Sequence, residues 1–152
     1  MATETIRAVR YYQRGVYFFE REQWADAVSN LRDSVTLYPE LISARMVLGV
    51  ALARQRLYLD AVRVLEEGRH FTAVDDQLML KLLRLLGIIC ILRQDFPAAQ
   101  YYLSEALEIA PNDPRLLNKL AATQCKSGNF VACFDLFLES SRQTSAPVDS
   151  DV

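Results

Sequence analysis

Residues 46–65 read MVLGVALARQRLYLDAVRVL and contain two short apolar segments joined by a polar connection. A small residue, Gly49, lies in the first segment, and an aromatic residue, Tyr58, opens the second. Ala61 and Leu65 follow Tyr58 on one helical face. Small side chains let two helices approach closely, and a leucine fills the space beside them. This stretch therefore predicts a pair of packed helices.

The same pattern recurs along the chain. Gly15, Gly49, Gly87 and Ala121 are separated by 34, 38 and 34 residues. Three further columns have the same spacing: Trp24, Tyr58, Phe96 and Phe130; Ala27, Ala61, Ala99 and Cys133; Leu31, Leu65, Leu103 and Phe137. Four columns that share one spacing indicate four copies of one helical pair, with four extra residues between the second and third copies.

These columns, together with Pro39, Pro111 and the helix-start signal Asn112-Asp113-Pro114, set the expected helix boundaries. We expect helices at about 4–20, 24–37, 41–55, 58–71, 76–93, 96–109, 114–127 and 130–142. The repeats span about 8–41, 42–75, 80–113 and 114–145 within one domain, residues 1–143. Residues 144–152 have the composition of a disordered acidic tail.

The pattern resembles the tetratricopeptide repeat (TPR) family, whose motif is Trp-x2-Leu-Gly-x2-Tyr, then Ala-x3-Phe, then Pro. The second repeat matches it at Leu48, Gly49 and Ala61, and the first and third repeats keep the proline as Pro39 and Pro111. The fourth repeat is the most divergent. The resemblance implies an all-α fold in which four helix-turn-helix repeats form a right-handed solenoid.

In the family, the first helix of each repeat lines a concave groove in which peptide ligands lie. Carried over by register, the resemblance places a set of largely apolar residues in the groove. The expected groove residues are Val9, Tyr12, Val16, Phe19, Met46, Val50, Arg54, Lys81, Arg84, Ile88, Ile91, Arg115 and Asn118.

The character of this groove predicts the character of its ligand. One TPR subtype grips carboxylate tails with Lys and Asn, but Tyr12, Val16 and Val50 stand at those positions here, so the donors are missing. The groove centre is apolar, which is typical of a binding surface. Basic residues at its far end favour acidic residues beside an apolar ligand segment. We therefore expect a protein or peptide partner with a hydrophobic segment flanked by acidic residues.

A second surface is expected at the C-terminal end. One column of the second helices is polar in the first three repeats, as Arg32, Glu66 and Ser104, but is Leu138 in the fourth. Val131, Phe134 and Leu136 make the last helix apolar nearly all round. Because terminal repeats need a polar outer face or a cover, we expect a second copy of the chain or another partner to pack there, unless these residues are simply exposed.

Composition excludes several function classes. The net charge of −2 in 152 residues gives no electrostatic reason to expect nucleic acid. The most apolar stretch, 78–92, contains Lys81 and Arg84 and is too short to insert in a membrane. No phosphate loop, metal spacing or catalytic motif occurs, so we expect no enzyme, cofactor or metal site. We interpret the three cysteines as mostly buried, reduced thiols of a cytoplasmic protein.

The leading hypothesis is a non-enzymatic peptide-binding module. A small TPR protein with an apolar groove resembles the cytosolic chaperones of bacterial type III secretion. The segments Arg45-Met46-Val47-Leu48-Gly49 and Ala53-Arg54-Gln55 are similar to the second repeat of those chaperones, although this chain departs from them in having four repeats. The alternative is a structural adaptor, a subunit docked permanently in a larger complex.

Overall fold

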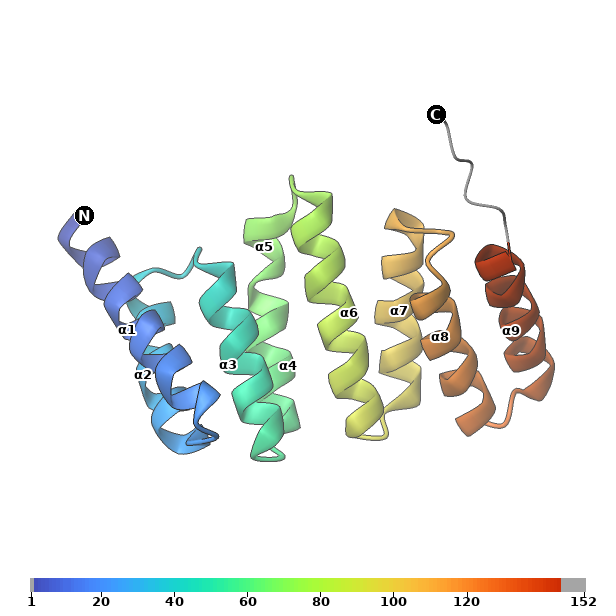
Figure 1. The fold of residues 1–152 in the computed structure, drawn as a ribbon, viewed down its shortest axis with the longest axis horizontal. Helices are drawn as coiled ribbons and strands as arrows, with labels where there is room; N and C mark the ends of the chain where they lie inside the picture. The colour runs from blue at the N-terminus through green and yellow to red at the C-terminus, as the bar shows by residue number, and fades with distance from the viewer. Residues whose placement is uncertain (1, 146–152) are drawn as a thin grey trace.

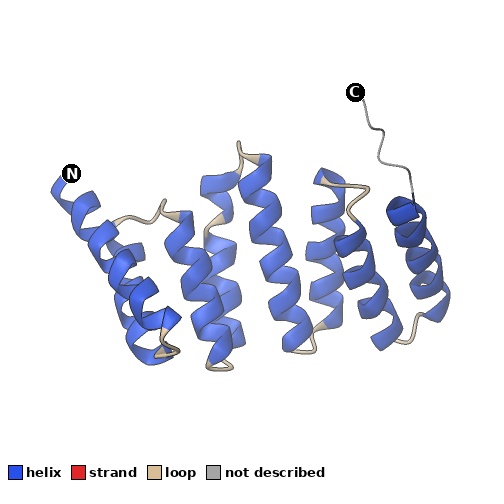
Figure 2. Cartoon of the chain, viewed as in Figure 1, coloured by secondary structure: helices blue, strands red, loops and turns tan. Residues whose placement is uncertain are grey.

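The computed structural model describes residues 2–145, and this part of the chain is helical with short connections and no strand (Figure 2). The helices are α1 (Ala2–Glu20), α2 (Trp24–Leu37), α3 (Ile42–Arg54), α4 (Tyr58–Glu67), α5 (Arg69–Thr72), α6 (Asp76–Leu92), α7 (Phe96–Ile109), α8 (Pro114–Lys126) and α9 (Phe130–Ser145). The predicted all-α fold is confirmed. Consecutive helices stand side by side in one elongated row, with α1 and α9 at opposite ends (Figure 1).

The turns inside the helical pairs repeat with the spacing of the sequence columns. Glu22, Arg56, Gln94 and Gly128 have positive φ angles of 58°, 62°, 64° and 85°. In each turn the next amide donates a hydrogen bond to a carbonyl five residues earlier, at 2.9–3.0 Å, as in Leu57 N to Leu52 O. This arrangement satisfies a carbonyl at the end of the first helix. The separations of 34, 38 and 34 residues therefore recur in the backbone conformation.

Helices within a pair are held close by a glycine–leucine contact. A Cβ built on Gly49 would lie 2.9 Å from side-chain atoms of Leu65, and one on Gly87 would lie 2.8 Å from Leu103. Leu65 and Leu103 are fully buried. Because real Cβ contacts are longer than this, glycine is the residue that lets α3 meet α4, and α6 meet α7, at this separation.

The helix predicted at 58–71 is interrupted at Gly68, so that prediction was wrong for its last turn. α4 ends at Glu67, and the short helix α5 follows Gly68 (Figure 1). The four extra residues between the second and third repeats lengthen the start of α6, which has 17 residues against 13 in α3. A Cβ on Gly68 would lie 3.2 Å from Cδ of the buried Arg45. Arg45 Nε donates to Pro39 O at 2.8 Å, and its Nη1 donates to Val64 O at 3.1 Å. The break at Gly68 therefore lies against a buried guanidinium that joins the first two repeats.

A polar network ties α5 to the next repeat. Arg69 forms ion pairs with Glu66 at 3.0 Å and with Glu105 at 2.7 Å. The hydroxyl of Tyr102 donates to Glu66 at 2.9 Å, and its burial, followed by the bond to Glu66, raises the pKa of this phenol. Part-buried ion pairs with several partners orient the groups that make them. The chain on both sides of Gly68 is therefore anchored to α7 by side chains from α4 and α5.

The C-terminal boundary also differs from the prediction. Helix α9 continues to Ser145, so Thr144 and Ser145 are helical and do not belong to a disordered tail. Ser140 Oγ donates to Pro114 O at 3.2 Å and joins the two helices of the last pair near this end. The rest of the predicted tail, 146–152, lies outside the described residues.

The interpretation of all three cysteines as reduced thiols was wrong for two of them. Cys125 and Cys133 form a disulfide between α8 and α9, with their Cα atoms 5.2 Å apart. Cys90 is a free, buried thiol on α6. Burial raises the pKa of Cys90 to about 11, so this thiol is neutral near pH 7 and a poor nucleophile.

Candidate functional site

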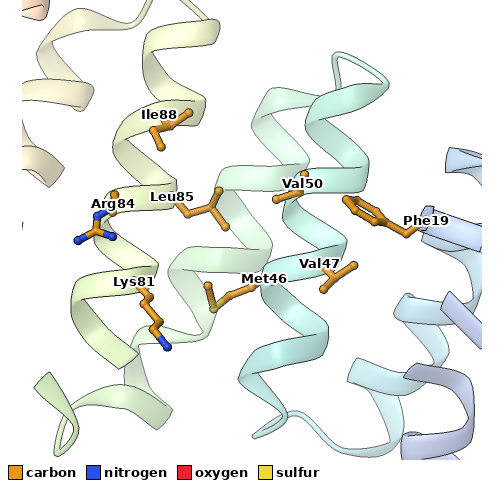
Figure 3. A pocket seen from close by; sticks show the side chains of 8 residues that line it. All are labelled: Phe19, Met46, Val47, Val50, Lys81, Arg84, Leu85 and Ile88. Carbon is orange, nitrogen blue, oxygen red and sulfur yellow. The ribbon is translucent and has the colours of Figure 1, made fainter. Parts of the chain in front are cut away.

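The helices α3 and α6 face each other across a hollow of about 440 Å³ (Figure 3). Met46 and Val50 come from α3, Leu85 and Ile88 from α6, and Phe19 reaches in from the end of α1. Each position is set by the helical repeat, because residues three and four apart share a face. The hollow is therefore built by the first helices of three successive repeats.

The floor of this hollow is almost entirely apolar. Its lining residues are Phe19, Met46, Val47, Val50, Lys81, Arg84, Leu85 and Ile88. A second hollow, of about 430 Å³, shares Val50, Leu85 and Ile88 with the first and continues to Arg54 and Leu92. The two hollows form one cleft along the α3–α6 interface, which we call the central cleft. Burying one aliphatic side chain there would contribute about 1.5–3 kcal/mol before the cost of ordering the ligand.

The two cations at the edge of the central cleft differ in their partners. Arg84 Nη2 donates to Asp113 Oδ2 at 3.2 Å, and Asp113 also caps the first turn of α8 by accepting from Arg115 N at 2.9 Å. Arg84 is thus charge-compensated. Lys81 is exposed and forms no ion pair with any residue in the range 2–145. A ligand carboxylate at this edge would therefore be attracted chiefly by Lys81.

The structure brings together some of the predicted groove residues and separates others. Phe19, Met46, Val50, Lys81, Arg84 and Ile88 line the first hollow, and Arg54 lines the second. Arg54 also stacks over the ring of Trp24, with its guanidinium carbon 5.6 Å from the ring centroid. The remaining residues line neither hollow: Val9, Tyr12, Val16, Ile91, Arg115 and Asn118.

Packing explains where several of these remaining residues lie. Tyr12 packs against the N-terminal core and Ile91 against the C-terminal core, so part of each side chain is already covered. Arg115 and Asn118 are exposed on α8. The central cleft is thus shorter than the predicted groove and lies mainly between the second and third repeats, with Phe19 from the first.

Sequence reasoning missed Val47 and Leu85, which also line the cleft. Each lies one residue beyond a residue that was included, Met46 and Arg84. Both are half-buried, and Figure 3 shows Leu85 pointing from α6 toward α3. The periodicity of a single helix does not reveal this, because two neighbouring first helices must be considered together.

The outer face of α9 exposes five large apolar side chains. The exposed residues are Phe130, Val131, Phe134, Phe137 and Leu138. Of the four residues predicted for this surface, Leu136 lies differently: it is half-buried and packs against the C-terminal core. The side chain of Leu136 points back into the array, whereas Phe134 is 64% exposed. We call the five exposed residues the α9 surface.

Within residues 2–145, no helix is long and apolar enough to cross a membrane. No group of three or more His, Cys, Asp and Glu side chains in that range has the geometry to hold a metal ion.

No family model matches this sequence, and no curated protein matches it. Solved structures do resemble it. A fragment of MamA from Desulfovibrio magneticus RS-1 superposes with a TM-score of 0.78 at 17% identity, covering 90% of this chain and 75% of the fragment. The apo form of RapI gives 0.80 at 13% identity over 92% of this chain and 56% of RapI.

A third structure, YrrB, is described as a TPR protein with an unusual peptide-binding site. It superposes with a TM-score of 0.69 at 16% identity, covering 90% of this chain and 68% of YrrB. The chain has the TPR fold. At these identities the likeness concerns the fold alone, and the residues that line the TPR groove here must be interpreted from their own chemistry.

Proposed function

We propose that this TPR chain binds an apolar segment of another protein in the central cleft, with an acidic ligand residue beside Lys81. The function is binding, without catalysis. The observation that carries the proposal is the juxtaposition of Met46, Val50 and Ile88 around a hollow of about 440 Å³. Preformed apolar hollows with a few polar groups at the edge are the usual form of a ligand site.

The test is binding to a panel of peptides of about 15 residues that vary in apolar and acidic content. Binding peptides should combine an aliphatic or aromatic anchor with a nearby Asp or Glu. Val50→Glu and Ile88→Glu should each weaken binding at least tenfold, because the bound apolar anchor would bury the new carboxylate and remove its water.

The matched control is Ala122→Glu, which adds the same charge at the equivalent position of the fourth repeat, outside the cleft. Ala122 is exposed, so this variant should fold and bind normally. If all three variants bind the peptides as the unaltered protein does, the ligand lies elsewhere and the proposal fails. Circular dichroism would verify that each variant keeps its helical content.

The role of this binding is proposed as that of a chaperone, which covers a hydrophobic segment of a client and releases it. Its support is the similarity of residues 45–49 and 53–55 to secretion chaperones, together with the open cleft. A chaperone should be soluble alone and exchange its client. An adaptor, the alternative, should depend on its partner for solubility. The cytoplasmic location remains a prediction, and the Cys125–Cys133 disulfide weakens the argument for it that was based on reduced thiols.

The α9 surface favours a second candidate role, pairing with another copy of this chain. Phe130 and Leu138 lie symmetrically about Phe134, as do Val131 and Phe137. An antiparallel crossing of two α9 helices at Phe134 would therefore place apolar side chains opposite apolar side chains. Such self-complementarity is what a two-fold interface requires.

A further inference from the structure

The face of α1 that points away from its neighbours has a row of basic side chains. Arg7, Arg10, Arg14 and Tyr17 recur at intervals of three and four residues, so they lie along one line of the helix, and Arg21 follows at the same interval in the turn just after α1. All five side chains are exposed. At 1.5 Å per residue the helical part of the row, from Arg7 to Tyr17, is about 15 Å long. We call these five residues the α1 arginine row.

This row is separate from the central cleft. Ala8 and Gly15 are the buried residues of α1, and a Cβ on Gly15 would lie 2.5 Å from Leu31 of α2. At about 100° per residue, Arg10 and Tyr17 point to the side of α1 opposite Ala8. Phe19, the α1 residue that lines the cleft, projects close to the buried side. A ligand on the row would therefore leave the cleft free.

The arginines of the row have no acidic partner within the described residues. Ion pairs in the range 2–145 involve Arg45, Arg63, Arg69, Arg84 and Arg93, but none of the four arginines of the row. Arg21 donates to the carbonyl of Tyr17 at 3.0 Å and lies over its ring, 3.5 Å from the centroid. Like charges three and four residues apart weaken a helix by a few tenths of a kcal/mol per pair.

A shallow hollow marks the middle of the row. Arg7, Arg10, Tyr11 and Arg14 line a space of about 190 Å³. Guanidinium groups bind carboxylates, as they bind phosphates, through two parallel hydrogen bonds. The spacing of the row, which averages 3.5 residues, is the spacing with which one helix packs along another. Both features fit a partner helix with carboxylates along one face.

We propose that the α1 arginine row docks an acidic helix of a partner protein. The net charge of the chain favours such a helix over a larger polyanion, a membrane or a nucleic acid. The chain has 19 acidic against 17 basic residues, so the surface outside the row is acidic overall. A membrane or a nucleic acid would extend past the row and meet that acidic surface, whereas a single helix would not.

The test uses two synthetic helical peptides of about 20 residues with identical composition. One has its glutamates along one face at intervals of three and four, and the other has them distributed around the helix. Fluorescence anisotropy at 0.15 M salt should show the one-face peptide binding at least tenfold more tightly to the full chain. Arg7→Glu/Arg14→Glu should remove that binding, and the same variant should gain affinity for a peptide with lysines in place of the glutamates.

The charge-matched control is Arg32→Glu/Arg142→Glu, which changes net charge equally outside the row and outside the central cleft. Both positions are exposed. This control should change affinity less than twofold. Equal binding of the two peptides, or equal loss in both variants, would overturn the proposal. The proposal would also be overturned if the chain bound phosphatidylserine vesicles or single-stranded RNA but did not bind the one-face peptide. Val50→Glu should leave this binding intact, which separates it from the cleft.

Discussion

The first three repeats and the fourth solve the same packing problem differently. In the first three, a glycine on the first helix meets a fully buried leucine on the second. In the fourth repeat, Ala121 takes the place of the glycine and Phe137 takes the place of the leucine. In the other repeats a Cβ at the glycine position would clash with the leucine. Phe137 is 43% exposed. The glycine and leucine are thus replaced by a larger pair in the fourth repeat, and part of the aromatic ring is in contact with solvent.

The fourth repeat also has a covalent link that the others lack. Cys133 occupies the column of Ala27, Ala61 and Ala99 and is bonded to Cys125 across the last turn. Close side-chain packing holds the helices of the first three repeats together, whereas the disulfide contributes part of that connection in the fourth. Equivalent positions in a repeat array can therefore contribute unequally to the free energy of unfolding.

The largest expected effect compares two residues of one column. Leu65→Ala removes a fully buried side chain and should lower the free energy of unfolding by about 3 kcal/mol. Phe137→Ala removes a half-exposed ring and should cost about 1 kcal/mol, because less of the ring is buried. Urea unfolding followed by circular dichroism would measure both. Equal losses would show that the fourth repeat is as tightly packed as the second.

A smaller effect should follow from removing the Cys125–Cys133 bond. The loop that it closes is short, so the chain-entropy model assigns it about 2.5 kcal/mol. Hydrogen exchange of Cys125→Ser/Cys133→Ser should show faster exchange in α8 and α9, with α1 to α4 unchanged. Treating this variant with dithiothreitol provides the control, because its remaining cysteine, Cys90, is already reduced. Faster exchange along the whole chain would contradict a local role.

The smallest expected change in stability is on the α9 surface. Phe134→Ser/Leu138→Ser should alter the free energy of unfolding by no more than about 0.5 kcal/mol, since both side chains are largely exposed. The same variant should convert a dimer to a monomer in light scattering. Leu59→Ser/Val74→Ser, at exposed apolar positions elsewhere, should leave the mass unchanged. A monomeric parent protein would contradict pairing through α9.

In the earlier repeats, the face equivalent to the α9 surface packs against the next repeat. Phe134 falls in one column with Val28, Val62 and Gln100. Val28 is in the core, and Gln100 donates to Gln124 and to Ser127 of the next repeat. The column thus faces the following repeat wherever one is present, so a polar substitution should be tolerated at Phe134 and should destabilise the core at Val28.

The sequence was sufficient to predict the helices and their register, apart from the interruption at Gly68. Columns such as Gly15, Gly49 and Gly87 predict close helix pairs, and Asp113 with Pro114 correctly predicts the start of α8. These signals are local, or they repeat at a constant interval, so each can be recognised without knowing the three-dimensional arrangement.

What the sequence did not show depends on contacts between repeats. The break at Gly68 follows from its approach to Arg45, which comes from another helix. The compensation of Arg84 by Asp113 joins residues 29 positions apart. The disulfide could have been found from the columns, because Cys125 and Cys133 occupy the positions of Ala53 and Ala61, on opposite sides of one tight turn. The cysteine count alone does not reveal this proximity.

Helix α6 belongs to both parts of the hydrophobic core. Its Leu82, Leu86 and Ile89 pack with the N-terminal cluster, while Leu80 and Leu83 pack with the C-terminal one. If either half unfolded, α6 would lose its contacts with that half and keep those with the other. Unfolding should therefore begin at α1 or α9 and reach α6 last. Because Ile88 on the same helix also lines the central cleft, a ligand held there would resist the spread of unfolding from both ends of the row.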